Sequence, residues 1–563
     1  MAGNDLPDEK NMDQLTPHRR SRSITAREFN ALSFDERLVM VHGAQGRDKY
    51  NLLLDAADGC QLLQLLPPQD LFLLIKELGQ DHVPELLAMA SPEQAAVCID
   101  LDCWQGDQID GEKALNWLLS ALGEGEEELV QRAGEIDFDL LVLVLQRSMR
   151  VVRGPESLFD EDQERPAGVM PYELEYADAE RAKPLGILVD CLFRKNEPFF
   201  LRLMEALRSE FPSALEEQVY QQRRNRLLEY GFPDPFEALG VYARVDVEDF
   251  DLAAYARPAS LPEPGPVAPG FVLVAVRSSH LLAEILEAGI GSGTVWDLSF
   301  LLNRVMVADG VDVGDSAAVQ ETMEQVYGYL NIALEKTCGH SLDRAREVFE
   351  STYLLGLLRL GYNVTLQLQQ EARRLRASSI GPFLDGPYAA LVTALQGRKP
   401  LYSKALDGIA QAGELPFTAL QQVETIRQRL HDVEVQRRLF EEHFSFELPT
   451  LQDLELNQEQ GGDVEPLTLS DYFLTALANR LLGRDFLPAP IARRELPDLH
   501  RLIAENGSLS NDLRRETLAW LESLEPGSEV FGNFCLEVWE EEFCSLKIDA
   551  LDPRYIGGLL IDK

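Results

Sequence analysis

LLQLLPPQDLFLLIKELGQDHVPELLAMASPEQAAVCIDLDCW, residues Leu62–Trp104, is the stretch that decides the fold class. It contains two helix starts, LPPQD at Leu66–Asp70 and ASPEQ at Ala90–Gln94. Proline suits the first turn of a helix, where its missing N–H leaves no bond unmade, and Ser91 can cap the free amides that follow. Apolar residues recur behind each start at helical spacing. Helices this short bury little surface alone, so the stretch predicts helices that stack on their neighbours.

The same helix-start chemistry recurs at LSFDE, Leu32–Glu36, and at IDFDL, Ile136–Leu140. Each start places a capping residue or a proline before an acidic or amide residue, which suits the positive end of the helix dipole. The spacing between the four starts is irregular, as in a loose solenoid rather than a strict repeat. We therefore predict an all-α fold, a superhelical, solenoid-like array of several helical units joined by proline-rich connectors.

Changes in composition along the chain predict where its segments begin and end. The clearest boundary is ARPASLPEPGPVAPG, residues 256–270, which holds five prolines. The apolar run that follows, Phe271–Val276, is compatible with a strand or a helix, and Trp520 and Trp539 are expected core anchors near the C-terminus. The expected segments are a flexible tail (1–23), a helical repeat domain (24–153), an acidic proline-containing linker (154–183), a helical segment (184–255), a proline-rich connector (256–270), a helical domain (271–446), a mobile loop (447–466) and a C-terminal helical segment (467–563).

Charge, apolar runs and cysteine spacing limit which partners and which compartment we expect. The 563 residues include 52 Lys and Arg against 94 Asp and Glu, a formal net charge of −42. Phosphate backbones are repelled by such a chain, so we expect no nucleic-acid binding. The N-terminus has no apolar signal region and no stretch reaches about 18 apolar residues, which predicts no membrane insertion. The 7 cysteines are scattered without CxxC spacing, as expected of a reducing, cytoplasmic setting.

One acidic cluster is a candidate cation site. Asp100, Asp102, Asp107 and Asp110 lie within eleven positions, and their oxygens are the ligand type that Mg²⁺ prefers. The spacing is not that of an EF-hand loop, since Trp104 occupies a ligand position. The alternative is a helix end followed by a polar turn, with Trp104 packed inward.

The aspartates and the nearby cysteines are also candidates for catalytic or zinc-binding residues. Asp100 and Asp102 resemble the DxD pair of haloacid-dehalogenase-like phosphatases, but the apolar residues before them fit a helix rather than the required strand. Cys98 and Cys103 have a poor spacing for zinc and are expected to be core cysteines. No set of residues forms a recognisable catalytic constellation, so we expect a non-catalytic protein that has no cofactor other than a possible Mg²⁺.

Two resemblances bear on the fold. The short helices opened by Pro-Glu/Gln or Phe-Asp turns over residues 24–153 resemble the N-terminal cytoplasmic superhelical domain of MgtE-type magnesium transporters, which implies a helical superhelix and magnesium sensing. No membrane domain follows here, unlike in those transporters. The pieces DLDCWQGDQID, YGFPDPFEALGVYARVD and LDPRYIGGLLIDK resemble an uncharacterised family of long acidic bacterial helical proteins, which implies no known activity.

These observations lead to one functional expectation and two alternatives. Stacked helices make extended surfaces, and this chain adds a strong acidic field. We expect a soluble interaction scaffold or regulatory adaptor that binds one or more protein partners. The alternatives are a helical regulator that senses divalent cations and an enzyme of unrecognised type with Asp100 and Asp102 as its leading carboxylates.

Overall fold

The computed structural model describes residues 24–121, 125–154, 170–258, 267–273, 280–403, 413–449, 467–505, 507–548 and 551–562. Helices make up most of these residues, and the strands form only two-stranded pairs. The predicted all-α fold is confirmed. The chain divides into two compact units, Met1–Arg359 (unit 1) and Leu360–Lys563 (unit 2), which are described separately. None of the helices within the described ranges combines the length and the apolar character needed to cross a membrane.

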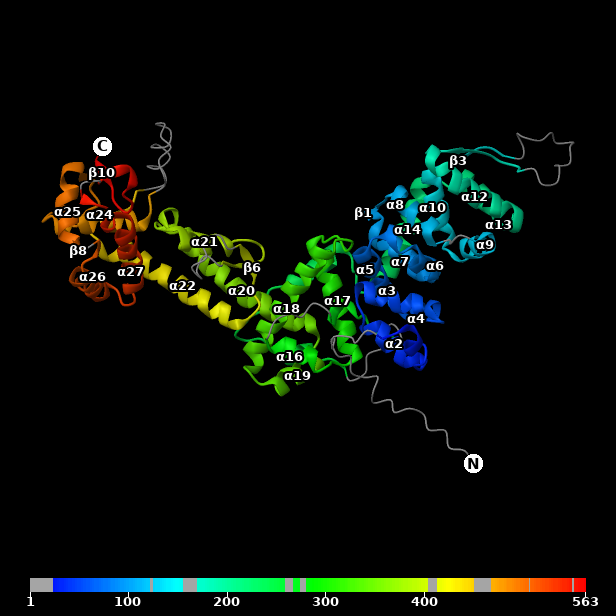
Figure 1. Cartoon of the computed structure of the whole chain (residues 1–563), viewed down its shortest axis with the longest axis horizontal. Helices are drawn as coiled ribbons and strands as arrows, with labels where there is room; N and C mark the ends of the chain where they lie inside the picture. The colour runs from blue at the N-terminus through cyan, green and yellow to red at the C-terminus, as the bar shows by residue number, and fades with distance from the viewer. Residues whose placement is uncertain are drawn as a thin grey trace, which may run out of the picture. The chain divides into compact units, whose positions relative to one another are not determined.

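Unit 1 is a succession of short and medium helices (Figure 1). Its strands are β1 (Trp104–Gln105) with β2 (Gln108–Ile109), and β3 (Met149–Arg153) with β4 (Glu173–Tyr176), both pairs antiparallel. Its helices are α1 (Ala26–Phe29), α2 (Phe34–Gly43), α3 (Gly46–Asp55), α4 (Gly59–Leu65), α5 (Pro68–Leu78), η2 (Gln80–His82), α6 (Pro84–Met89), α7 (Pro92–Asp102), α8 (Gly111–Ala121), α9 (Glu126–Glu135), α10 (Phe138–Ser148), α12 (Ala179–Lys195), α13 (Glu197–Ser209), α14 (Pro212–Glu229), α15 (Pro235–Ala238), η3 (Leu239–Tyr242), η4 (Leu252–Tyr255), η5 (Phe271–Leu273), α16 (Leu281–Glu287), α17 (Ser292–Asp309), α18 (Ser316–Cys338) and α19 (Leu342–Ser351).

All four predicted helix starts in unit 1 are confirmed. Ser33 and Ser91 each form a capping box, in which the serine oxygen accepts from the backbone N–H three residues on and that residue's side chain accepts from the serine N–H. Asp137 caps α10 with its carboxylate, and Pro68 opens α5. Local capping chemistry therefore fixes where these helices begin.

The helices of unit 1 stack mainly on neighbours that are close in sequence, as the stacking expectation required. Helix α4 packs on α6, α5 on α7, α6 on α8 and α8 on α10 (Figure 1). Gln94, a member of the α7 capping box, also donates to the carbonyl oxygens of Leu63 and Leu66 at the end of α4. One residue thus starts a helix and ties it to an earlier one.

The end of the proline-rich connector is docked on the first helices. The ring nitrogen Nε2 of His42 donates to the carbonyl oxygen of Ala268 over 2.6 Å, and the Asp70 carboxylate accepts from the backbone N–H of Gly270 over 2.8 Å. Burial lowers the pKa of His42. Residues 267–273 of this segment therefore belong to the packed body of unit 1, and Phe271–Leu273 is a short 3₁₀ helix, whereas residues 259–266 and 274–279 lie outside the described part.

Unit 2 is built from longer helices with a few short strands (Figure 1). Helix α20 (Leu354–Arg376) begins just before the boundary and ends in this unit. The strand pairs are β5 (Leu401–Ser403) with β6 (Glu414–Pro416), β8 (Ala504–Glu505) with β9 (Ser508–Leu509), and β7 (Ile491–Ala492) with β10 (Ile561–Asp562), the last pair parallel. The other helices are η6 (Gly381–Phe383), α21 (Gly386–Ala394), α22 (Leu420–Arg438), the π-helix η8 (Leu439–His443), α24 (Leu469–Leu481), η9 (Arg493–Glu495), α25 (Leu496–Ile503), α26 (Asn511–Leu524), α27 (Glu529–Trp539), the π-helix η10 (Glu540–Cys544) and η12 (Pro553–Tyr555).

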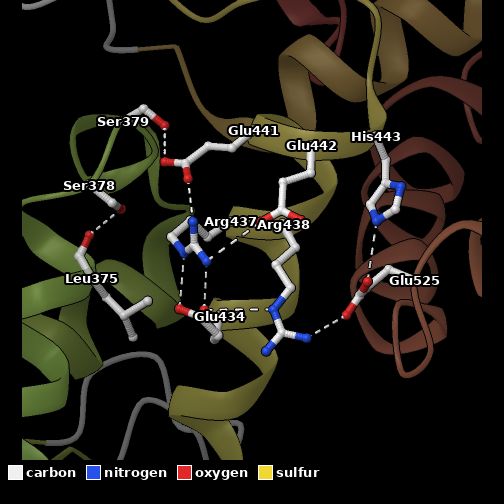
Figure 2. A network of polar contacts seen from close by, with 10 residues as sticks. All are labelled: Leu375, Ser378, Ser379, Glu434, Arg437, Arg438, Glu441, Glu442, His443 and Glu525. Atoms are coloured by element: carbon white, nitrogen blue, oxygen red, sulfur yellow. Dashed lines mark hydrogen bonds and ion pairs between the residues drawn. The ribbon is translucent and has the colours of Figure 1, made fainter.

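A network of ion pairs joins three segments of unit 2 (Figure 2). Arg437 pairs with Glu434 over 2.8 Å and also with Glu441, which accepts from the hydroxyl of Ser379. Glu525, at the end of α26, accepts from Arg438 over 2.8 Å and lies 3.2 Å from the ring of His443. The network links the turn after α20, the α22–η8 junction and the end of α26. Its partners all lie within the unit, so we assign it a structural role.

A buried carboxylate in unit 2 predicts a pH-dependent stability. Asp385 precedes α21 and accepts from the hydroxyl of Ser470 over 2.5 Å and from the Ser470 N–H, and burial raises its pKa to about 6. A raised pKa in the folded state means that stability is fully present below the unfolded value, about 3.9, and is lost as the pH rises through 6. Asp385→Asn cannot ionise, so between pH 4 and pH 8 the wild type should lose on the order of 2–3 kcal/mol more of its free energy of unfolding than this variant.

Urea unfolding of both proteins across that pH range measures the difference in their free energies of unfolding. Hydrogen exchange of peptides from unit 2 shows whether the change occurs in that unit. The two proteins should converge near pH 4. Parallel curves from pH 4 to pH 8 would show that Asp385 does not titrate in this range.

The segments expected from composition can be placed on this structure. The boundary between the units lies within 271–446, which the sequence treats as one helical domain. The expected linker 154–183 contains β4 and the first turn of α12. The expected tail, 1–23, and most of the expected mobile loop, 450–466, lie outside the described residues.

Candidate functional site

A cleft of about 640 Å³ lies within unit 1. Three parts of the chain form its walls: the end of α7 with the β1–β2 hairpin, the second half of α14 with the turn into α15, and the end of α17 with the loop after it. Apolar and aromatic side chains contribute about half of its lining, which includes Leu101, Trp104, Tyr220, Leu227, Leu228, Phe232, Pro233, Val307, Val311 and Val313. Its volume falls in the range of about 300–1,000 Å³ that is typical of small-molecule sites.

A buried ion pair holds the first two walls together. Asp100, whose side chain is 0% exposed, accepts two hydrogen bonds from the guanidinium of Arg226, over 2.8 and 3.1 Å. Asp137 lies 3.6 Å from the same guanidinium. Burial raises the pKa of Asp100, and Arg226 opposes that rise. Two charges far apart in sequence therefore join α7 to α14.

The third wall is fixed by a buried amide pair and a tight turn. Gln69 of α5 and Asn303 of α17 exchange two hydrogen bonds of 2.8 Å, and Asn303 also donates to the carbonyl oxygen of Tyr230 at the end of α14. The next residue, Gly231, has φ +83°, and a Cβ atom there would lie 2.6 Å from the ring of Phe300. Only glycine permits this close approach of the chain to α17.

The turn into α15 follows the sequence prediction. Asp234 caps α15 by accepting from the N–H of Phe236, and Pro235 occupies the first helical position. The Asp234 carboxylate also pairs with Arg224 over 3.0 Å. The YGFPDPFEALG segment thus supplies one wall of the cleft, as DLDCWQGDQID supplies another.

The four predicted cation ligands have separate roles. Asp100 pairs with Arg226, while Asp102 pairs with Lys76 over 2.6 Å and accepts from the indole N–H of Trp117. Asp110 accepts from two backbone N–H groups at the start of α8, and Asp107 lies exposed in the β1–β2 turn. Within the described ranges, no group of three or more His, Cys, Asp or Glu side chains is placed to hold a metal ion. The structure therefore does not bring these aspartates together as a ligand set, and magnesium sensing stays a prediction.

Arg223 is the residue that the sequence did not single out. It lines the cleft with its guanidinium carbon 5.4 Å from the ring centre of Trp104 and 6.0 Å from that of Tyr220. Its Nε donates to the carbonyl oxygen of Asp100 over 2.9 Å, and burial lowers its pKa. Arg223 and Arg226 lie three residues apart on α14 and so share a face. Sequence reasoning could use only such local spacings, because Asp100 lies 123 residues from Arg223 and 126 residues from Arg226.

Two further donors line the cleft without a partner in the described part of the chain. The indole N–H of Trp104 is buried and makes no hydrogen bond there. The ammonium group of Lys113 forms no ion pair with any described carboxylate. Arg223 and Lys113 can therefore contact a negative charge in the cleft without breaking an existing ion pair.

The cysteines of this region are not available for metal binding or attack. Cys98 and Cys103 are buried, as the sequence predicted, and all seven cysteines are free. Burial raises the pKa of both thiols well above their ordinary value. A thiol that stays protonated is a poor nucleophile and a poor metal ligand.

A second cavity of about 350 Å³ shares Leu228 and Pro233 with the cleft. Its main charged group is Asp297, which pairs with Arg257 over 2.7 Å and accepts from the N–H of Leu354. Arg257 also donates to the hydroxyl of Thr294. This carboxylate is fully engaged, so we assign it to the packing of unit 1.

Comparison with known proteins gives one match. A family model described as "Family of unknown function (DUF6178)" matches residues 26–562, nearly the whole chain. No curated protein and no solved structure matches the chain. The predicted relation to an uncharacterised family is confirmed, and the resemblance of residues 24–153 to MgtE-type transporters stays a prediction.

Proposed function

This chain belongs to a family of unknown function (DUF6178), and we propose that it is a non-catalytic interaction scaffold or regulatory adaptor that binds a protein partner around the cleft of unit 1. The observation that carries this proposal is a set of exposed apolar side chains at the end of α14 and in the α15–η3 segment, which includes residues that line the cleft. Leu228, which lines the cleft, is 56% exposed, Phe236 is 86% exposed and Leu239 is 44% exposed. We call these three residues the rim patch.

The rim patch has the features of a protein interface. Single exposed apolar residues are ordinary, but an aromatic side chain and two leucines beside a concave site make a surface that an apolar partner surface can cover. Phenylalanine is also enriched at interfaces. The net charge of −42 would steer a partner with a basic surface toward the chain from a distance.

The test compares what two matched variants capture. Phe236→Ser combined with Leu228→Ser removes most of the apolar surface of the rim patch. Phe211→Ser is the control, because Phe211 is 78% exposed and lies at the other end of α14, about 25 Å along the helix from Leu228. Because all three residues are exposed, the melting temperature should stay within about 2 °C of the wild type.

In affinity capture with the full chain, we expect a stoichiometric partner to bind the wild type and Phe211→Ser but not the double variant. Retention of that partner by the double variant would place the interface elsewhere. The absence of any stoichiometric partner in gentle salt would contradict the adaptor proposal itself.

A further inference from the structure

Arg223 lies in a chain whose acidic residues outnumber its basic ones 94 to 52. Its neighbours on α14, Arg224 and Arg226, each pair with a carboxylate. Arg223 instead uses one N–H for a backbone carbonyl and lies near two aromatic rings, and no described carboxylate lies within ion-pair distance. Its two terminal nitrogens are the part of a guanidinium that binds carboxylates in a bidentate way.

The acids that line the cleft do not neutralise this arginine. Asp102 is paired with Lys76 and Asp234 with Arg224, while Glu237 pairs with Arg304 over 3.0 Å. Two others, Asp110 and Asp312, accept hydrogen bonds from nearby backbone N–H groups. Two cations, Arg223 and Lys113, are therefore left without a carboxylate partner in the same cleft as the unbonded indole N–H of Trp104.

The same acids limit how much negative charge the cleft tolerates. A phosphate dianion would add repulsion from Asp110 and Asp312, which form no ion pair with a described cation, whereas a single carboxylate can be contacted by both Arg223 and Lys113. The lining by Trp104, Tyr220 and Phe232 favours a planar apolar group beside that charge. The volume suits a small molecule.

We propose that this cleft binds a small organic carboxylate with a planar apolar body, recognised by Arg223 and Lys113 and packed against the ring of Trp104. The inference rests on the proposed function for its biological role, because a ligand in the cleft would change the surface beside the rim patch and so regulate the adaptor. Ligand binding itself can be measured without the partner.

The test uses phenylacetate, its neutral amide phenylacetamide and phenyl phosphate as probes, each titrated calorimetrically into the full chain at constant ionic strength. For a carboxylate of this size we expect a Kd of about 1 mM at one site. Phenylacetamide and phenyl phosphate should each bind at least about tenfold more weakly. The amide has no negative charge, and the phosphate has more negative charge than the two cations balance.

Variants assign the binding to the cleft. Arg223→Gln and Lys113→Gln should each weaken phenylacetate binding by about tenfold or more. Arg427→Gln in α22 of unit 2 removes the same charge elsewhere and should leave the Kd unchanged. The Lys113 side chain is exposed and unpaired in the described structure, so Lys113→Gln should fold. This variant therefore still tests the site if Arg223→Gln does not fold.

Equal binding of phenylacetate and phenylacetamide would overturn the inference, as would an unchanged Kd in the folded cleft variants or no phenylacetate binding at all. None of these results involves the protein partner. A partner captured through the rim patch would then leave the proposed adaptor function standing, whereas phenylacetate binding without any captured partner would support the ligand site alone.

Discussion

Replacing Arg226 by Met is expected to lower the free energy of unfolding of unit 1 by about 3–5 kcal/mol. The reason is the position of Asp100, whose carboxylate is 0% exposed and receives both of its charged hydrogen bonds from Arg226. Without Arg226, the carboxylate must stay ionised without a partner or take up a proton, and both outcomes disfavour the folded state. Chemical denaturation gives the total change, and hydrogen exchange of peptides from α7 and α14 assigns it to unit 1.

Two control variants show whether the loss of stability comes from leaving the buried Asp100 carboxylate without its partner. Arg150→Met breaks an ion pair with Glu175 whose side chains are 76% and 60% exposed, so it should cost about 1 kcal/mol or less. Asp100→Leu combined with Arg226→Met removes both buried charges and should recover most of the stability lost in the single variant. A single variant no less stable than Arg150→Met would show that Asp100 is not held in a desolvated ion pair.

The same ion pair shows why the cation site could not be judged from the sequence. Asp100 and Asp102 look like oxygen ligands because they are close together and near two more aspartates. Their partners, Arg226 and Lys76, are 126 and 26 residues away, and only the folded chain brings them within hydrogen-bond distance. A short acidic motif predicts available carboxylates, but it does not show which of them are already used.

The fold could be predicted more fully from the sequence, because the residues that begin each helix act on nearby backbone groups. Ser33, Ser91, Asp137 and the proline at 68 act within one turn of the helices they begin, so the sequence alone locates those starts. The proline-rich connector shows the limit of this reasoning. Its composition predicts a boundary, yet its end is held by His42 and Asp70, which no local pattern connects with it.

The cleft, too, is formed by segments that are far apart in the sequence. Both family-like pieces, DLDCWQGDQID and YGFPDPFEALG, contribute walls, so the sequence pointed to the correct segments. It did not single out Arg223, because an arginine on a helix looks like a solvated residue until the ring of Trp104, which is distant in sequence, is placed beside it. The structure shows separate partners for the predicted cation ligands, and the anion site in the cleft is our proposal.

In unit 2, Trp539→Ala is expected to lower the free energy of unfolding by about 3–5 kcal/mol. Trp539 ends α27 and is completely buried, as the sequence predicted for a core anchor. Its removal would leave a large cavity at the end of α27, a helix that packs on α24. Hydrogen exchange should show faster opening of α24 and α27 with little change in α7 or α14, because those helices belong to the other unit.

Trp539→Phe is the matched variant for this position. The indole N–H of Trp539 is buried and has no hydrogen-bond partner among the described residues, so phenylalanine removes a polar group that gains nothing from burial. The smaller ring still fills much of the space, and the loss should be about 1–2 kcal/mol. Equal losses for alanine and phenylalanine would mean that the indole N–H, and not the volume of the ring, stabilises unit 2. Faster exchange in α7 and α14 of the alanine variant would instead show that the two units unfold together.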